Sequence, residues 1–177
     1  MAEKTEYKIF TIADFEEEEK WLESEHKKGW ELEKITAGFI YKFKKVAPNN
    51  IVYRLDFGEN KASDDYFQLY RDYGWEHFYS FMGWHYFRKE VQEDADKNEV
   101  EIFSDKESKI DMIDKIYITR MMPIFIIFCL AIIPNLFDFN GEFNASKVFY
   151  LLAFILYLYI IVHCGAKLTK LKKELEK

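Results

Sequence analysis

The first half of the chain alternates between two hydrophobic periods, that of a β-strand and that of an α-helix. Residues 7–12 alternate and are rich in β-forming side chains, which predicts a strand. From Asp14 the apolar spacing becomes helical, Glu17 would complete a capping box, and Gly29 suits a left-handed cap at the helix end. The alternation then returns twice, and the predicted strands are 30–36 and 39–45.

The same pattern recurs at an offset of 45 residues without a gap. Such a fixed period indicates one supersecondary unit that is used twice. The clearest match is Gly29-Trp30-Glu31, which returns as Gly74-Trp75-Glu76, and the turn glycine Gly38 returns as Gly83. The repeat therefore predicts equivalent core positions in the two copies, which are Trp21, Trp30, Tyr66 and Trp75.

Two βαββ units predict an α+β fold over residues 1–90, with six strands and two helices. The second unit would contain a strand at 51–57, a helix from Ser63 to Tyr73, and strands at 75–81 and 84–89. An amphipathic helix must bury its apolar stripe, so we expect both helices on one face of a shared six-stranded sheet. The other face would be solvated or a binding surface. Its candidate residues are Tyr41, Tyr53, Phe81, Trp84 and Tyr86, although aromatic residues in so small a fold are more often core.

The second half of the chain is dominated by two apolar segments. Residues 121–137 and 148–166 contain no acidic or basic side chain other than His163. Extending the first segment back to residue 116 gives two predicted transmembrane helices of sufficient length. The predicted order is an acidic linker and juxtamembrane helix at 91–115, transmembrane helices at 116–137 and 148–166 joined by an external turn at 138–147, and a basic cytoplasmic tail at 167–177.

Flanking charges predict which side of the membrane each part occupies. Lys115 and Arg120 flank the start of the first span and several lysines follow the second, whereas the turn contains one Lys. The positive-inside rule therefore places both termini in the cytoplasm, in a cell-membrane protein with two spans. No apolar run follows Met1, so no signal peptide is expected. The tail would be a helix on anionic lipid, a short pairing helix or the frayed end of the second span.

Charge and cysteine usage exclude several classes of function. The first 109 residues carry 17 Lys and Arg against 25 Asp and Glu, a net charge of −8, which argues against direct binding of nucleic acid. Cys129 and Cys164 both lie in the apolar segments. A cysteine-based zinc site and a disulfide framework are therefore not expected. No bound cofactor is expected either.

The polar candidates for chemistry are an acidic run and two histidines. Residues 16–19 are all Glu and lie in the first turn of the predicted helix, where we expect solvated carboxylates facing the helix dipole. His77 and His85 lie on adjacent predicted strands and could bind a metal only with Asp56 or Glu76 as a further ligand. Histidines on a protein surface usually bind no metal, so we do not expect a site here. No nucleophile elbow, phosphate-binding loop or zinc motif is present, so we expect no catalytic residue, no metal and no enzymatic activity.

Several segments resemble the bacterial family known as domain of unknown function 2812. The likeness covers residues 7–90 and lies in residues 14–22, Lys28-Gly29-Trp30-Glu31-Leu32, residues 52–57, and the stretch from Gly74 to Lys89. The apolar C-terminal hairpin is also similar to that family. The resemblance implies a membrane-anchored cytoplasmic domain, often encoded beside PadR-type transcription regulators in Gram-positive bacteria. It implies no catalytic residues.

Three hypotheses follow for the function. The leading one is a regulatory or interaction module that is anchored in the lipid bilayer and binds a cytoplasmic protein, such as a PadR-like regulator, in an envelope-stress response. The alternative is a sensor that binds a small apolar ligand or peptide on the aromatic sheet face. An enzyme would require polar side chains that converge in a cleft, and no such set stands out in the sequence.

Overall fold

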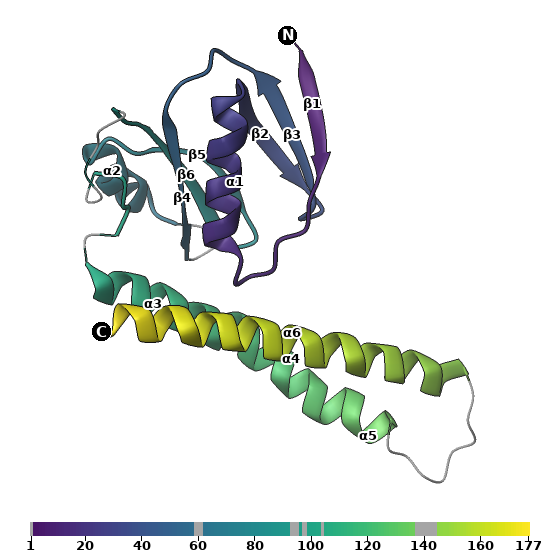
Figure 1. The fold of residues 1–177 in the computed structure, drawn as a ribbon. Helices are drawn as coiled ribbons and strands as arrows, with labels where there is room; N and C mark the ends of the chain where they lie inside the picture. The colour runs from purple at the N-terminus through teal and green to yellow at the C-terminus, as the bar shows by residue number, and fades with distance from the viewer. Residues whose placement is uncertain (1, 59–61, 93–95, 97–98, 104, 137–144) are drawn as a thin grey trace. The chain divides into compact units, whose positions relative to one another are not determined.

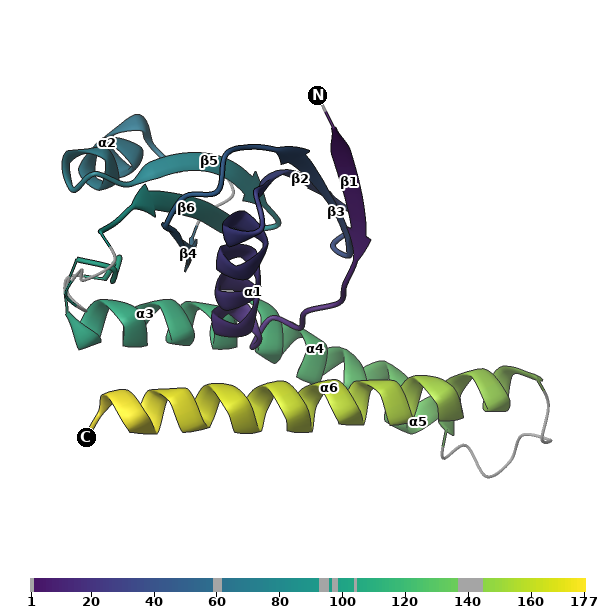
Figure 2. The ribbon, with the colours of Figure 1, turned by 45° about the horizontal axis from the view of Figure 1, so that its top comes forward.

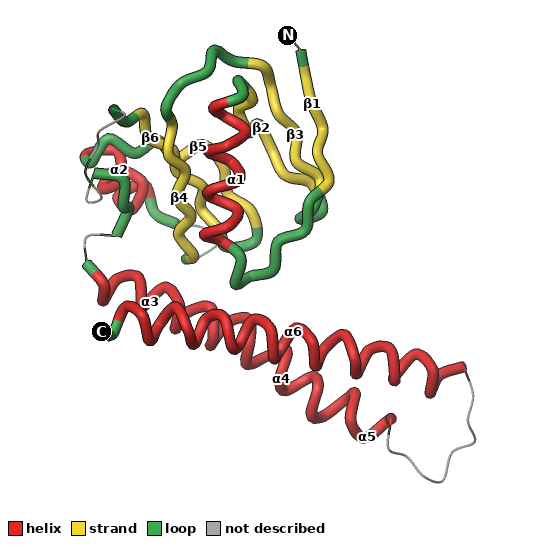
Figure 3. The backbone as a smooth tube through the Cα atoms, in the orientation of Figure 1, coloured by secondary structure: helices red, strands yellow, loops and turns green. Residues whose placement is uncertain are grey.

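The protein forms two compact units along the chain, Met1–Met112 and Ile113–Lys177. The structure, a computed structural model, describes residues 2–58, 62–92, 96, 99–103, 105–136 and 145–177 (Figure 1). We call the first unit the head and the second unit the helical hairpin. In the described part of the chain, the strands all lie in the head (Figure 3).

The six strands of the head form two three-stranded antiparallel sheets instead of the single six-stranded sheet that we predicted. Sheet A has the strand order β1-β3-β2 and sheet B has the order β4-β6-β5. The strands are β1 Glu3–Tyr7, β2 Trp30–Thr36, β3 Ile40–Lys45, β4 Ile51–Phe57, β5 Glu76–Phe81 and β6 Trp84–Glu90. The helices are α1 Phe15–Lys27 and α2 Asp64–Asp72, and α3 Lys106–Ile116 begins in the head.

The two sheets stay separate because the strands that meet, β2 and β5, are both irregular. The pairing register shifts between Leu32 and Lys34 in β2 and between His77 and Tyr79 in β5. A bulge bends and twists a strand, which makes it a poor partner for continuous pairing. The two strands are joined instead by a side chain, since the Tyr79 hydroxyl donates to the carbonyl oxygen of Ile35 at 2.6 Å.

Each sheet contains one tight hairpin, and both turns lie at the predicted glycines. Ala37 and Gly38 have φ angles of 53° and 79°, and Met82 and Gly83 have φ angles of 50° and 89°. Positive φ at both central residues is typical of a type I′ turn, whose twist matches that of the flanking strands. Glycine at the second position adopts this conformation without steric strain.

The first strand begins at Glu3, earlier than the predicted strand at 7–12. The strand does not continue through residue 12 because the chain turns there. The N–H and the hydroxyl of Thr11 both donate to the carboxylate of Asp14, at 2.7 and 2.6 Å. That carboxylate makes no side-chain cap of α1, so the predicted capping box is not formed.

The helices α1 and α2 cover opposite faces of sheet B, and the prediction of one shared face was wrong (Figure 2). In β6, the hydroxyl of Tyr86 donates to Glu18 of α1. The next ring along the strand, Phe87, packs against Tyr70 of α2 with ring centroids 4.4 Å apart. Successive strand residues point to opposite faces. Because α1 lies between the two sheets and takes the inner face of sheet B, α2 is left with the outer face.

Residues beyond β6 complete an apolar core on one face of sheet B. Ile102 is buried together with Val52, Trp75 and Phe87, on the face of sheet B that α2 covers. The half-buried residues packed against this cluster are Tyr66, Phe67, Tyr70, Val91, Val100 and Phe103. The segment 91–115, predicted as a linker and juxtamembrane helix, therefore contributes packing in its described part, and the first compact unit extends to Met112.

The two halves of the head share local features at the predicted offset. Gly29 after α1 and Gly74 after α2 have φ angles of 82° and 81°, as expected for left-handed caps. The environments of the two tryptophans that follow differ. Trp75 is buried and Trp30 is half-buried, although each ring has a lysine ammonium over it, Lys89 at 5.6 Å from the Trp75 centroid and Lys45 at 4.5 Å from the Trp30 centroid. The duplication of the unit stays a prediction.

The helical hairpin is made of two long antiparallel helices. The hydroxyl of Tyr117 in the first donates to the carbonyl of Gly165 in the second at 3.0 Å. Farther along, Phe128 packs against Phe154 with ring centroids 5.2 Å apart. The first helix runs from Lys106 to Leu136 through α3, η1 Tyr117–Met121, α4 Met122–Ile127, η2 Phe128–Ile132 and α5 Ile133–Leu136, and the second is α6 Ala145–Leu175.

Two π-helical turns in the first helix, η1 and η2, each end two residues before a proline, Pro123 and Pro134. A proline has no N–H and its ring collides with the carbonyl four residues earlier, so a wider turn accommodates it. Both long helices have 31 residues and are long and apolar enough to cross a membrane. The predicted spans fall within them, except for residue 137, and the predicted turn 138–147 lies outside the described residues as far as residue 144.

Candidate functional site

Two of the four glutamates at the start of α1 are buried, contrary to the predicted solvated turn. Glu18 is 6% exposed and Glu19 is 8% exposed. Glu17 is exposed, and Glu16 forms an ion pair with Lys109, whose Nζ lies 3.0 Å from Oε1. The prediction was wrong because α1 lies between two sheets, so that more than one side of its first turn faces protein instead of water.

Glu18 links the two sheets through a single carboxylate oxygen. The hydroxyl of Tyr41, on β3 of sheet A, donates to Oε1 at 3.0 Å. The hydroxyl of Tyr86, on β6 of sheet B, donates to the same atom at 2.9 Å. Both tyrosines are buried. One buried acid thus joins a helix and two strands that are far apart in the sequence.

Two further acids of α1, one helical turn apart, satisfy the backbone of β4. Oε1 of Glu19 accepts the N–H of Leu55 at 2.8 Å, and Oε1 of Glu23 accepts the N–H of Tyr53 at 3.3 Å. Arg54 supplies the counter-charge, with Nη1 2.7 Å from Glu23 Oε1 and 3.9 Å from Glu19 Oε2. The edge of β4 is therefore covered by α1, which prevents another strand from pairing there.

Burial dominates the electrostatics of these acids. Loss of solvation raises the pKa of Glu18 to about 7, although the two tyrosine hydrogen bonds favour the ionised form. Loss of solvation also raises the pKa of Glu19 to about 8, against the attraction of Arg54. The pKa values of Tyr41 and Tyr86 are raised by burial and by the Glu18 charge, so both remain hydroxyl donors. The protonation of Glu18 is thereby coupled to the packing of both sheets.

The aromatic residues predicted as a binding surface belong to the interior of the head. Tyr53 has its hydroxyl 2.7 Å from Nδ1 of His26 in α1, and the ring of Trp84 packs against Phe15 with centroids 5.5 Å apart. These positions give a ligand no open aromatic face. Of the five predicted residues, Tyr41, Tyr53, Trp84 and Tyr86 are buried and Phe81 is half-buried. Of the four predicted core positions, Trp75 is buried and Trp21, Trp30 and Tyr66 are half-buried.

The two histidines considered as metal ligands come together around a serine. His77 Nε2 and His85 Nδ1 each lie 2.8 Å from the hydroxyl oxygen of Ser80. The acids considered as further ligands are engaged elsewhere, because Asp56 accepts two tyrosine hydroxyls of α2 and Glu76 forms an ion pair with an arginine of β6. Within the described ranges, no group of three or more His, Cys, Asp or Glu could hold a metal ion.

One sheet edge differs from the others in having no strand or helix against it in the described part of the head. The edge of β4 is covered by α1, and β2 and β5 face each other, which leaves β1. Large apolar side chains lie near the end of this strand. Tyr7 is 73% exposed, Ile9 is 81% exposed and Phe39, next to the β3 end of the hairpin, is 40% exposed. Sequence reasoning missed this surface, since exposure depends on which edges the sheets cover.

The chain matches one family model among known protein families. The family model described as "Protein of unknown function (DUF2812)" matches residues 14–127. The chain belongs to this family. The match confirms the resemblance seen in the sequence and extends it from sheet B into the first helix of the hairpin. No curated protein and no solved structure matches this DUF2812 member.

Proposed function

We propose that the protein is a membrane-anchored module that holds its head in the cytoplasm and binds a cytoplasmic protein there. The exposed apolar surface of the two long helices carries this proposal. Only 6% of the most apolar window of α6 is buried, whereas a core helix of a soluble protein would be mostly buried. Side chains such as Phe125, Leu130, Leu152, Ile155 and Val162 are exposed along the hairpin. A surface of this kind is stable in lipid.

The charges of the hairpin support a cytoplasmic head. Lys115 and Arg120 lie at the same end of the hairpin as the lysines from residue 167 onwards, because Tyr117 contacts Gly165 and the carboxylate of Asp114 pairs with Lys172. Basic residues near membrane spans concentrate on the cytoplasmic side. Both termini would then lie in the cytoplasm, and the segment that joins the helices would lie outside.

Binding of a protein is favoured over catalysis because the buried acids of α1 already form hydrogen bonds within the head. Glu18 accepts two tyrosine hydroxyls and Glu19 accepts a backbone N–H. The β1 edge, with Tyr7 and Ile9 beside it, offers backbone groups and apolar side chains to a partner that adds a strand. The family resemblance suggests a PadR-type transcription regulator as this partner, in a response to envelope stress.

We also propose that the head is a duplicated βαββ unit. Support comes from the equal strand order of the two sheets, in which the last strand of each unit is central. The type I′ turns and the glycines after α1 and α2 also recur at the offset of 45 residues. The copies differ in where the helix packs, since α1 lies between the sheets and α2 covers an outer face.

Labelling of intact cells tests the orientation. In a full-length chain with Cys129 and Cys164 replaced by serine, one cysteine is introduced by Gly141→Cys and, in a second variant, by Glu174→Cys. A membrane-impermeant thiol reagent should label the Gly141→Cys variant on intact cells and the Glu174→Cys variant only after lysis. The reverse pattern would place the head outside the cell and exclude every cytoplasmic partner.

Capture of partners with the full-length chain in mild detergent tests the interaction. Lys8 N–H donates to the Phe39 carbonyl and Lys45 N–H donates to the Ala2 carbonyl, so the even residues of β1 bond to β3 and Thr5 presents its N–H at the free edge. Thr5→Pro removes that outward donor and spares the ladder, and Thr5→Val is the matched control. Recovery of a regulator by the wild-type and Thr5→Val chains, but not by Thr5→Pro, is expected. Equal recovery by all three, or no regulator with the wild type, would contradict the proposal.

A further inference from the structure

The helix α6 changes character at Gly165. The residues before it are apolar, whereas residues 167–177 contain five lysines and two glutamates. The helix continues without a break to Leu175, so the lysines are held on a regular surface. The contact of Tyr117 with Gly165 and Thr169 fixes this part of α6 against the first helix. The basic end of the hairpin is therefore an ordered structure at the depth where the predicted span ends.

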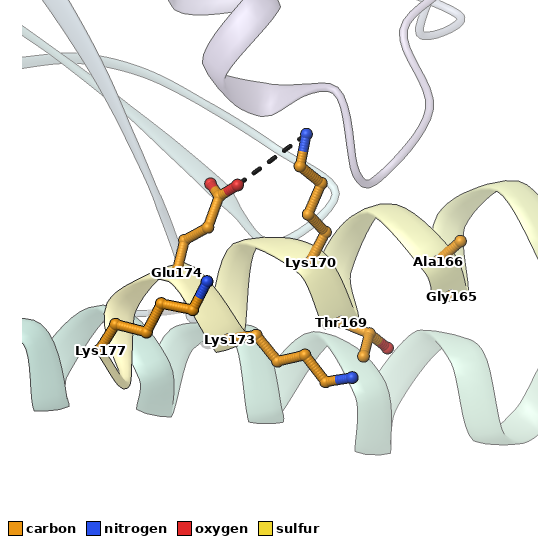
Figure 4. A pocket seen from close by; sticks show the side chains of 7 residues that line it. All are labelled: Gly165, Ala166, Thr169, Lys170, Lys173, Glu174 and Lys177. Atoms are coloured by element: carbon orange, nitrogen blue, oxygen red, sulfur yellow. Dashed lines mark ion pairs between the residues drawn. The ribbon is translucent and has the colours of Figure 1, made fainter.

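A hollow of about 480 Å³ lies along this part of α6 (Figure 4). Its floor is formed by three small residues, Gly165, Ala166 and Thr169. A Cβ added at Gly165 would meet no heavy atom within 4 Å, so the space above the floor is open. Toward the helix end, the hollow is lined by three lysines and one acid, which are Lys170, Lys173, Lys177 and Glu174.

The lining carries a net positive charge that the protein does not neutralise fully. The lining contains three lysines and one glutamate. The ion pair between Lys170 and Glu174 is long, at 3.9 Å, and both side chains are more than half exposed. Such exposed pairs contribute little to stability, so an external anion can replace the carboxylate. By contrast, Lys172 is held by the carboxylate of Asp114 at 2.6 Å and does not belong to the hollow.

The order of small residues and lysines matches the two parts of a phospholipid. From Gly165 to Lys173 the helix rises by about 12 Å, which takes the surface from acyl-chain depth to headgroup depth. The small residues leave room for a chain beside the helix, and the lysines provide donors at the level of the phosphate. Lys115 and Arg120, which flank Tyr117 on the first helix, add positive charge at the same end of the hairpin.

We propose that this hollow on α6, floored by Gly165, Ala166 and Thr169 and lined by Lys170, Lys173 and Lys177, is a binding site for one anionic phospholipid of the cytoplasmic leaflet. The inference rests on the proposed membrane anchoring and specifies a ligand for it. The phosphate and a second anionic or hydroxyl group of the headgroup bind the ammonium groups, and one acyl chain lies over the small residues.

Lipid retention by the full-length protein tests the site. The chain is reconstituted in phosphatidylcholine bilayers with or without phosphatidylglycerol, and retained lipid is counted by native mass spectrometry. The variant Lys170→Gln, Lys173→Gln, Lys177→Gln should lose its preference for phosphatidylglycerol by more than about tenfold. The matched control replaces three exposed lysines of the head, Lys20, Lys27 and Lys34, by glutamine and should retain the preference.

A second variant separates shape from charge. Ala166→Leu fills the floor of the hollow and leaves every lysine in place, so the preference should fall there as well. Two results would overturn the site. One is equal retention of phosphatidylglycerol by the wild type and the lysine variant, and the other is a loss of preference in the control variant as large as in the lysine variant. Displacement of the lipid by millimolar inorganic phosphate would show that the site binds a free anion instead. A wild-type chain that does not insert into the bilayer would refute the membrane anchoring, whereas an inserted chain without lipid preference would refute the site alone.

Discussion

Replacing Glu18 by glutamine should stabilise the head above neutral pH and change its stability much less in acid. Glutamine has the shape of glutamate and keeps Oε1, which accepts the hydroxyls of Tyr41 and Tyr86 at 3.0 and 2.9 Å. It cannot ionise. The substitution therefore removes the buried charge and leaves the two hydrogen bonds that link the sheets.

The magnitude follows from the pKa of the buried acid. Burial raises the pKa of Glu18 from 4.5 to about 7, so the folded protein holds the proton more tightly than the unfolded chain. The stability contributed by the neutral acid is fully present below 4.5 and is lost as the pH rises to about 7. A difference of roughly 2.5 in pKa corresponds to about 3 kcal/mol. The gain from Glu18→Gln should therefore grow by about 2–3 kcal/mol across this range.

Urea unfolding of the full-length protein in mild detergent measures this difference. All four tryptophans lie in the head, so their fluorescence follows its unfolding and not that of the helical hairpin. Wild type and variant are compared from about pH 5 to about pH 8. Other acids that titrate in this range, Glu19 among them, are present in both proteins, and to first order their effect cancels in the difference.

A difference between the two proteins that does not change with pH would refute the reasoning, because Glu18 would then titrate alike in the folded and unfolded states. Tyr86→Phe provides an independent check. It removes a donor that favours the ionised carboxylate, so it should raise the pKa of Glu18 further and extend the loss of stability to higher pH. If the Tyr86→Phe variant instead completed its loss of stability at a lower pH than the wild type, this account would be contradicted.

Other substitutions in the head test its packing and its backbone. Trp75→Ala should lower the free energy of unfolding by about 3–5 kcal/mol, and Trp30→Ala, at a half-buried position, should cost less. Gly29→Ala should cost more than about 1 kcal/mol, because its φ is +82° and the new Cβ would lie 2.9 Å from a backbone carbonyl oxygen. Arg54→Gln should lower the free energy of unfolding mainly above about pH 8, where Glu19 is ionised in the wild type and would lose its counter-charge. Urea unfolding followed by far-UV circular dichroism measures the free energy of unfolding of all four variants. An equal loss for the two tryptophan variants, or no loss for the Gly29 or Arg54 variant, would contradict the stated reasons.

The sequence by itself determined the elements of this protein and their order. Hydrophobic period distinguishes a strand from a helix within a few residues, so five of the six strands and both head helices lie close to where the pattern predicts them. The turns at Gly38 and Gly83 are also local, because positive φ selects glycine. The two apolar helices follow from runs of uncharged residues long enough to cross a bilayer. Each of these properties depends on neighbours in the chain.

The tertiary structure decided which faces and which charges are buried. Nothing local distinguishes a glutamate that faces water from one that faces a strand, and the partner of Glu18 on β6 lies 68 residues away. The division into two sheets depends on bulges in β2 and β5, and the burial of Tyr41 and Tyr86 depends on α1 lying between those sheets. Periodicity shows that a helix has an apolar side. It does not show whether other parts of the chain will also cover the polar sides of that helix. Burial, pKa and exposed edges are set by contacts between distant segments, and they exist only once the chain has folded.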